Sequence, residues 1–327
     1  MKQITEAARK ITDLEVQGAT HIAIYGVKQF IDFAKRHEGM EEKEFMKTLF
    51  EAQHLLSSAR DTEPALRNGL LYILGKIHKD RKEGIDEDIA KMVEIYGNEY
   101  LQIMRDSKKH IAKFGSRLIP EDDEDFVIQT HCHSSIVESI LIEAANKGKK
   151  FKVVSTETRP FYQGRITAKK LTDHGIEVIQ VVDSAMRWAA KNLETDLMII
   201  GADAVTSEGT VLNKIGSRLL ALVAEEEHIP LFIATPLLKY NPSTLYGSYE
   251  KIEMREITEI TKDWDEVPNK NLEILNPAFE TVNRLLINGL ITEAGIFPSS
   301  EIHMTFRHYY TFLSEAYTIL ENEETFF

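Results

Sequence analysis

Cysteine, long apolar runs and positive charge are all scarce in this sequence. Cys132 is the only cysteine among 327 residues, so the chain forms no internal disulfide, which agrees with a reducing compartment. No apolar run approaches the roughly 20 residues that a membrane-spanning helix needs, and residues 1–6 lack the apolar core of a signal peptide. We therefore expect a cytoplasmic protein without membrane contacts.

The shortage of positive charge limits the partners of the chain. With 39 Lys and Arg against 52 Asp and Glu, the formal net charge is −13, which disfavours non-specific binding of nucleic acid. An anionic ligand would need positive groups gathered in one place. Apolar residues make up 43% of the chain, which is ample for the core of one large or two ordinary domains.

The first third of the chain has a purely helical pattern. Apolar residues recur there at spacings of three and four, with Lys and Glu between them, as in helices that bury one face. The helical segments include residues 22–34, 41–56, 65–77 and 87–114. Five consecutive acidic residues at 121–125 are better explained as a solvated linker than as a metal site. We therefore predict a helical bundle over 1–118 and a second domain over 119–327.

Beyond the acidic run, short β-branched runs alternate with helical segments. The expected strands are residues 126–129, 151–155, 177–182, 196–200 and 230–234, and the expected helices are 136–147, 166–174, 184–192 and 216–227. Several of these strands are apolar on both faces, as a parallel sheet requires. The alternation predicts an α/β fold with a doubly wound, Rossmann-like parallel sheet and helices on both faces.

Polar residues follow the predicted strand ends, where ligands bind in such sheets. They are Cys132, Glu157, Asp183, Asp203 and Lys239. One crevice could gather all five of them.

Cys132 has two interpretations. A lone thiol most often fills space in a core. However, the neighbouring His131, His133 and two serines are costly to bury without partners, which favours a polar cleft. Asp203 could then join the thiol as a proton-transferring pair. The histidines are zinc-like ligands, but no second cysteine completes a typical structural site, so we predict neither metal nor cofactor.

The segment from Asp203 to Gly216 is also open to two interpretations. Asp203 could cap a helix or turn, with Asn213 and Lys214 in a surface loop. Alternatively, Asp203 is an acid or base, and Asn213, Lys214 and the start of the Gly216 helix hold an anion.

Arg60 precedes an expected helix start, with Thr62 as its cap and Pro64 in its first turn. Beside that positive helix end, Arg60 could contact a phosphate. Arg159 could do the same, although pairing with Glu157 is the interpretation we favour. The pair Gly18 and Ala19 would let the backbone approach a ligand closely.

Together these segments resemble one superfamily, the sugar-phosphate isomerases related to the regulatory subunits of translation initiation factor 2B, and in particular its archaeal ribose-1,5-bisphosphate isomerases. The resemblance extends over nearly the whole chain. Its motifs are, in order, LEVQGA at Leu14, ARDTEPALRN at Ala59, THCHS at Thr130, TETRPFYQGRITAK at Thr156, VVDSA at Val181, GADAV at Gly201, NKIGS at Asn213, KYNP at Lys239, IEMRE at Ile252 and NPAFE at Asn276.

The resemblance implies that Cys132 accepts a proton and Asp203 donates one. Because the regulatory subunits generally lack this pair, it also implies an enzyme. The implied substrate contacts are Gly18, Ala19, Arg60, Ser134, Ser135, Asn213, Lys214 and Lys239. Three positions depart from the family pattern. Gln17 replaces an arginine, Asp61 a proline and Ser135 a lysine, so two cationic phosphate contacts are missing.

The implied reaction converts α-D-ribose 1,5-bisphosphate into D-ribulose 1,5-bisphosphate in AMP metabolism, by transfer of a proton from C2 to C1. One alternative is the same chemistry on 5-methylthioribose 1-phosphate or 5-deoxyribose 1-phosphate, whose lower charge would suit the missing cations. Another is a non-catalytic regulatory subunit that senses a nucleotide or sugar phosphate. The resemblance also implies a homo-oligomer, dimeric through the α/β domain and hexameric in the archaeal isomerases, and leaves open a nucleotide activator.

The mechanism also makes a demand on the thiol. An ordinary cysteine is a poor base at neutral pH because it is mostly protonated. We therefore expect Lys214, Arg60 or a nearby imidazolium to lower the pKa of Cys132, while Asp203 starts neutral.

Overall fold

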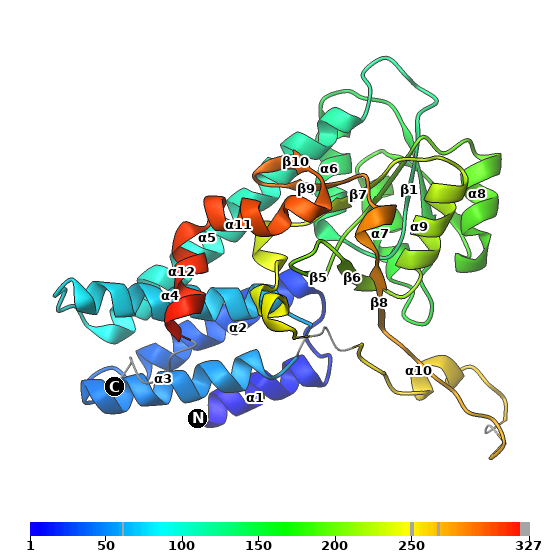
Figure 1. Ribbon diagram of the computed structural model, residues 1–327. Coiled ribbons are helices and arrows are strands. Elements are labelled where there is room, and N and C mark those ends of the chain that lie inside the picture. Colours follow the sequence, from blue (N-terminus) through cyan, green and yellow to red (C-terminus); the bar gives the residue numbers. More distant parts are fainter. Residues whose placement is uncertain (61, 249–251, 267–268, 321–327) are drawn as a thin grey trace.

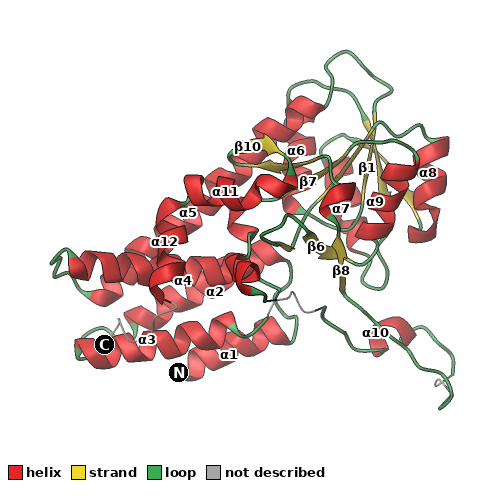
Figure 2. Ribbon diagram, viewed as in Figure 1, coloured by secondary structure: helices red, strands yellow, loops and turns green. Residues whose placement is uncertain are grey.

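The computed structural model describes residues 1–60, 62–248, 252–266 and 269–320, so Asp61 lies outside the described residues (Figure 1). Figure 2 shows the N-terminal part as helices alone, with every strand in the later part of the chain. No helix in the described ranges has both the length and the apolarity to cross a bilayer.

The N-terminal part consists of α1 (Lys2–Thr12), α2 (Ala19–Lys35), α3 (Glu42–Ser57), α4 (Pro64–Lys82) and α5 (Ile89–Gly115), followed by the short 3-10 turn η1 (Ser116–Leu118). Each helix buries the apolar face that its spacing predicts. Phe30, Leu49 and Leu70, from three different helices, are completely inaccessible in one shared cluster. The expectation of helices only up to about residue 115 is confirmed.

α5 joins the helical part to the sheet. Its 27 residues span about 40 Å at 1.5 Å per residue, and it packs on α2 and α4 and then on α6 (Ser135–Asn146). Gly115 permits the last contact, since a Cβ there would lie 2.5 Å from Cδ1 of Ile140. Because one helix belongs to both parts, the domain boundary at residue 118 stays a prediction.

The main sheet has seven strands in the order β10-β9-β7-β4-β1-β2-β3. They are β1 (Val127–Thr130), β2 (Lys152–Thr156), β3 (Glu177–Val181), β4 (Leu197–Ile200), β7 (Leu231–Ala234), β9 (Gly289–Thr292) and β10 (Gly295–Phe297). All neighbours are parallel except β10, which runs antiparallel to β9. With α6, α7 (Gln163–Asp173), α8 (Met186–Asn192) and α9 (Ser217–Glu226), this confirms the predicted doubly wound fold.

The order of the strands places a switch point between β1 and β4. From β1 the chain adds β2 and β3 on one side, and then returns to add β4, β7 and β9 on the other. β1 and β4 are paired, with Ile128 beside Leu197. Connections that leave two neighbouring strands in opposite directions open a crevice at their carboxyl ends. Cys132 follows β1 and Asp203 follows β4, so both lie at this crevice.

A second sheet, which we did not predict, has the order β5-β6-β8 and is antiparallel. Its strands are β5 (Ala204–Val205), β6 (Val211–Lys214) and β8 (Phe279–Val282). Asn213 and Lys214 belong to β6 and are 6% and 8% exposed, so their interpretation as a surface loop is wrong. Local sequence patterns do not predict this sheet, because β5 is very short and β8 is far from its partner β6 in the sequence.

The remaining elements are short 3-10 turns along the α/β part and three further helices. They are η2 (Asp183–Ala185), η3 (Leu237–Lys239), η4 (Pro242–Tyr246), α10 (Thr258–Thr261), η5 (Arg284–Leu286), η6 (Ser299–Glu301), α11 (Ile302–Tyr309) and α12 (Thr311–Leu320). α12 returns to pack on α4. α10 lies on an arm that projects away from the rest of the molecule (Figure 1). The arm is pinned at its base, where the Arg255 N–H donates to the carbonyl of Asn276 at 2.8 Å.

Asn68 fastens the helical part to the loop after β7. It is fully buried on α4, and its Nδ2 donates to the carbonyls of Leu238 at 2.7 Å and Tyr240 at 3.0 Å. These two carbonyls flank Lys239, so the amide holds the backbone that carries this predicted site residue.

We expect Asn68→Ala to lower the free energy of unfolding by about 1–3 kcal/mol, because it leaves two buried carbonyls without their donor. Denaturant titration measures the change. Asn98→Ala, at an exposed position of α5, is the matched control and should stay within about 0.5 kcal/mol of the wild type. Equal stabilities of the two variants would contradict this role of Asn68.

Candidate active site

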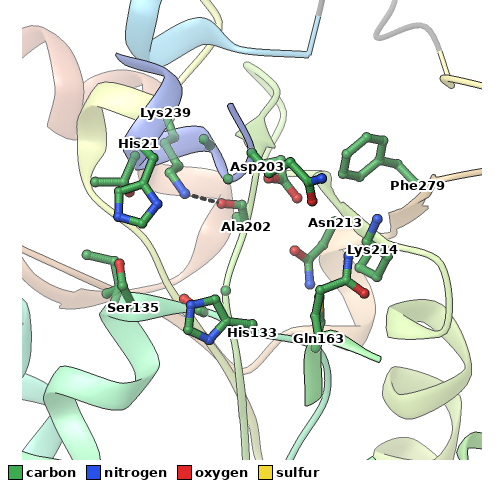
Figure 3. A pocket seen from close by; sticks show the side chains of 18 of the residues that line it. His21, His133, Ser135, Gln163, Ala202, Asp203, Asn213, Lys214, Lys239 and Phe279 are labelled. Carbon is green, nitrogen blue, oxygen red and sulfur yellow. Dashed lines mark hydrogen bonds between the residues drawn. The ribbon is translucent and has the colours of Figure 1, made fainter. Parts of the chain in front are cut away.

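A cavity of about 400 Å³ opens at the switch point. Helix α2, the turn after β1, the end of β4, strand β6 and the base of the arm all contribute to its wall. Figure 3 shows the side chains that converge on it. The lining includes the implied catalytic and substrate-contact residues, which are Gly18, Ala19, Arg60, Cys132, Ser134, Ser135, Asp203, Asn213, Lys214 and Lys239. The expectation that one crevice gathers all five polar strand-end residues is wrong for Glu157 and Asp183, which do not line the cavity. The Asp183 carboxylate instead accepts from the N–H groups of Thr158 and Arg159, both at 2.7 Å.

The turn that carries Cys132 is fixed by hydrogen bonds to both the N–H and the carbonyl of this residue. Cys132 has a φ of 67°, a left-handed conformation that is uncommon for a residue with a Cβ. Its N–H donates to Oγ1 of Thr158 at 3.0 Å, and its carbonyl accepts from Oγ1 of Thr167 at 3.1 Å. The loop and helix after β2 therefore fix the thiol at the cavity wall, so the core-filling interpretation of Cys132 is wrong.

The two histidines beside Cys132 have structural partners. Nε2 of the buried His131 lies 2.8 Å from the carbonyl of Ile215, which makes this nitrogen the donor and leaves Nδ1 to accept from the Thr156 hydroxyl at 2.6 Å. Burial lowers the pKa of His131, so its ring is neutral. His133 pairs with Glu138 at 2.9 Å. In the described ranges, no group of three or more His, Cys, Asp or Glu is arranged to hold a metal ion.

The expected lowering of the thiol pKa is wrong. Burial raises the pKa of Cys132 to about 11. The Lys214 ammonium and the His133 N–H oppose this rise, but they do not overcome it. The neutral ring of His131 adds no positive charge. Desolvation thus outweighs the cations near this thiol.

Asp203 lies where β4 passes into the second sheet. Its backbone N–H donates to the carbonyl of Leu212 at 2.9 Å, which joins the end of β4 to β6. Its carboxyl group is directed toward the cavity (Figure 3) and has no hydrogen bond to the residues that the structure describes. The alternative role as a helix or turn cap therefore has no supporting bond.

Two helices start at the cavity wall. α2 begins at Ala19 after Gly18, and α6 begins at Ser135 after Ser134. Gly18 has a φ of 82°, which favours glycine at this cap. Gly201 lets the end of β4 approach α6, because a Cβ there would lie 2.6 Å from Oγ of Ser134. Unpaired N–H groups at helix starts attract anions, so this side of the cavity suits a phosphate.

Of the two interpretations of the segment from Asp203 to Gly216, the one that holds an anion is wrong at the start of the Gly216 helix, because a carboxylate from the chain already occupies it. Oε1 of Glu280, on β8, accepts from the N–H groups of Gly216 at 2.6 Å and Arg218 at 3.0 Å. The amide of Asn213 donates to Oγ of Ser217 at 2.8 Å. The start of α9 is therefore satisfied from within the fold.

Two predicted cationic contacts have strong internal partners. Nζ of Lys239 donates to the carbonyl of Ala202 at 2.5 Å. Nε and Nη2 of Arg60 both donate to Oε2 of Glu253, at 3.0 and 2.7 Å, and its Nη1 lies 3.3 Å from Oε1 of Glu63. Burial, and then the charge of Asp203, raise the pKa of Glu63.

Some local predictions near these residues are also wrong. Helix α4 begins at Pro64 as expected, but Glu63 rather than Thr62 occupies the cap position, and it forms no capping bond. Glu157 pairs with Arg165 at 2.7 Å instead of with Arg159. Arg159 donates to the hydroxyl of Tyr162 at 2.6 Å.

Sequence reasoning did not single out Arg255, Phe279, Thr20 and His21, which also line the cavity. Arg255 and Phe279 lie within the quoted motifs IEMRE and NPAFE, which was the available signal. Nothing in their spacing shows that the base of the arm brings them to β6. His21 lies one helical turn after Gly18, which places it at the same helix start.

A doubly wound sheet with a polar cavity at its switch point defines a ligand-binding α/β protein. Comparison with known proteins gives its relatives. The model of the initiation factor 2 subunit family matches residues 15–299, and the chain belongs to this family. The resemblance seen in the sequence is confirmed.

Three relatives illustrate the range of the family. The ribose 1,5-bisphosphate isomerase of Thermococcus kodakarensis is 37% identical over 301 residues, which cover 91% of this chain and 92% of that protein. The methylthioribose-1-phosphate isomerase of Thermosipho melanesiensis is 31% identical over 309 residues, with coverages of 90% and 86%. Among solved structures, translation initiation factor eIF-2B of Pyrococcus horikoshii OT3 is 27% identical with a TM-score of 0.75, covering 91% of this chain and 98% of that one.

The raised pKa of Cys132 predicts an unusual pH profile of alkylation. Because the thiolate reacts and the pKa is about 11, the rate with iodoacetamide should rise about tenfold per pH unit up to pH 10. An ordinary thiol such as glutathione, the control, levels off above its pKa near 8.5–9. The chain has no other cysteine, so the label reports on this site alone. A plateau below pH 9 would contradict the effect of burial.

Proposed function

We propose that this protein converts α-D-ribose 1,5-bisphosphate into D-ribulose 1,5-bisphosphate, with Cys132 as the base and Asp203 as the acid. The chain is a sugar-phosphate isomerase, since relatives that match most of it are isomerases of this class. The observation that supports the specific proposal is the meeting of a thiol, a carboxyl group and several cations in one cavity at the switch point.

The chemistry requires two groups that act on neighbouring atoms. The thiolate of Cys132 takes the C2 proton, and the electron pair of the C–H bond forms a C1–C2 double bond. The C1 bond to the ring oxygen breaks, and this oxygen takes a proton from Asp203. The Cys132 thiol then returns its proton to C1, while the Asp203 carboxylate removes the proton from the C2 hydroxyl to give the ketone. Both residues finish in their starting protonation states.

The pair needs one proton, placed on Asp203 rather than Cys132. Moving it from the thiol to the carboxylate leaves the total charge of the cavity unchanged. The raised pKa of Cys132 indicates that the thiol holds its proton before substrate binds. We infer that bound substrate makes this proton transfer from Cys132 to Asp203 possible. Among the cations, Lys214 contributes most to lowering the pKa of Cys132, so it would stabilise the thiolate.

The cavity offers two separate regions for two phosphates. Figure 3 shows His21 and Ser135 on one side and Lys214 and Phe279 on the other, with Asp203 and His133 between them. The first side has the starts of α2 and α6, and the second has the cations Arg60 and Lys214. A sugar with a phosphate at each end would span both regions and leave its C1 and C2 near the acid and base.

Methylthioribose 1-phosphate is the second candidate substrate. The Thermosipho relative carries this activity in its name, and Gln17 and Ser135 stand where the family pattern has an arginine and a lysine. Such a substrate would need only one anion-binding region.

The assay uses the purified protein with ribose 1,5-bisphosphate, 5-methylthioribose 1-phosphate and 5-deoxyribose 1-phosphate, and it follows ketose formation by NMR. We expect turnover of the bisphosphate with the highest kcat/KM. Cys132→Ser and Asp203→Asn should each reduce kcat by about 10²–10⁴-fold, as is typical for loss of a general acid or base. Asp122→Asn, in the exposed acidic run, is the control and should retain full activity.

Each alternative has its own outcome. A higher kcat/KM with methylthioribose 1-phosphate would replace the bisphosphate as substrate. Near-full turnover by Asp203→Asn, together with loss in Cys132→Ser, would exclude Asp203 as the acid. No turnover of any of the three sugars by the wild type would favour a regulatory subunit.

Assembly belongs to this proposal as well. We propose a homo-oligomer built from dimers, on the basis of the family. Whether the number is six, and whether a nucleotide activates the protein, are questions for mass measurement and for assays with and without AMP.

A further inference from the structure

Arg255 is a buried cation whose hydrogen bonds are incomplete. It lies at the base of the arm, lines the cavity, and its side chain is 6% exposed. Its Nε donates to Oε1 of Glu253 at 3.0 Å. Its Nη1 is buried and has no hydrogen-bond partner among the residues that the structure describes. A buried, unsatisfied guanidinium nitrogen is costly, so a ligand is the natural partner for it.

Arg60, the cation that the family resemblance indicated at this end, is in the opposite situation. All three of its nitrogens face carboxylates, two bonds going to Glu253 and a contact to Glu63. Burial alone would raise the pKa of Glu253, but Arg60 and then Arg255 hold this pKa below its ordinary value. Glu253 is therefore ionised and neutralises part of the charge of both arginines.

The surroundings of Arg255 form a cationic region around one aromatic ring. Lys214 Nζ lies 4.6 Å, Arg60 Cζ 5.4 Å and Arg255 Cζ 6.0 Å from the centre of the Phe279 ring. Glu253 bonds two of these cations, Arg60 and Arg255, and Glu63 contacts Arg60 alone among them. Without Arg255, the carboxylate would balance Arg60 and only Lys214 would remain for an anion. Arg255 thus supplies surplus positive charge at the end of the cavity that faces Cys132.

We propose that Arg255 binds one phosphate group of the substrate through its free Nη1, together with Lys214, while Glu253 fixes the orientation of the guanidinium. This role of Arg255 rests on the proposed function and adds to it. Arg255 would provide a cationic phosphate contact in a chain that has Gln17 and Ser135 where the family pattern has an arginine and a lysine. The phosphate replaces no internal bond of Arg255, since Nη1 has none to lose.

The experiment compares wild type, Arg255→Gln and Arg255→Lys, with Arg36→Gln as the matched control at the exposed C-terminal end of α2. Inorganic phosphate is the first probe, titrated by ³¹P NMR. Steady-state kinetics with ribose 1,5-bisphosphate is the second readout. We expect Arg255→Gln to weaken phosphate binding and to raise KM on the order of 10- to 100-fold, the range for loss of a charge-assisted hydrogen bond. Since binding is the lost contribution, kcat should change less than KM.

Arg255→Lys separates charge from geometry. It keeps a positive charge but not the planar fork, so it should fall between wild type and Arg255→Gln in phosphate affinity. Arg36→Gln should match the wild type in every measurement. Melting temperatures within a few degrees of the wild type show that the variants are folded. If Arg255→Gln is unfolded, the phosphate affinity of Arg255→Lys is the test. An affinity equal to that of the wild type would overturn the proposal.

The two proposals fail in different ways. Unchanged phosphate affinity and unchanged KM in folded Arg255→Gln would refute the role of Arg255 and leave the isomerase proposal intact. A second outcome combines two results: Arg255→Gln loses phosphate binding, and the wild type does not turn over the bisphosphate. It would support the role of Arg255 and refute the proposed substrate.

Discussion

The pairing of β1 with β4 is the constraint on which the rest of the structure depends. These parallel neighbours have Gln129 beside Met198, and their connections leave in opposite directions. Their carboxyl ends therefore meet at one edge with no crossing chain above them. Cys132 and Asp203 are 71 residues apart in sequence, yet each follows one of these strands within three residues of its end. A slip in this register would separate the thiol from the carboxyl group.

Internal pairing of polar groups decides which parts of the cavity remain available to a ligand. Burying charged groups in a small cavity is expensive, and most of them are satisfied by the fold itself. Glu280 occupies the start of α9, Lys239 bonds a carbonyl, and Arg60 is held by Glu253. The groups left over are chemically consistent with one another. They are a thiol, a carboxyl group and the cations Lys214 and Arg255 beside the Phe279 ring, as an acid-base reaction on an anionic sugar requires.

Sequence reasoning located most of the site because strand ends in a doubly wound sheet are predictable from local patterns. The alternation of strands and helices places Cys132, Asp203 and Lys239 at one edge without any knowledge of contacts. Strand pairing between distant parts of the chain could not be predicted from local patterns. β8 joins β6 across more than 60 residues, and this pairing brings in Phe279, Arg255 and the carboxylate of Glu280. The pKa of Cys132 was also mispredicted, because a list of nearby cations does not reveal how much burial opposes them.

The helical part is a component of the cavity and not only a neighbour of it. Gly18, Ala19 and Arg60 come from the first 60 residues, and they line the same wall as residues that follow strands of the α/β part. The amide of Asn68 fixes the backbone on either side of Lys239, and α12 returns to α4 on the other flank. A sheet without its helical part would therefore keep the thiol and the carboxyl group, but it would lose the part of the cavity wall that Gly18, Ala19 and Arg60 form. In this fold, docking of the two parts creates the binding site, so binding of a sugar phosphate should stabilise their contact by mass action.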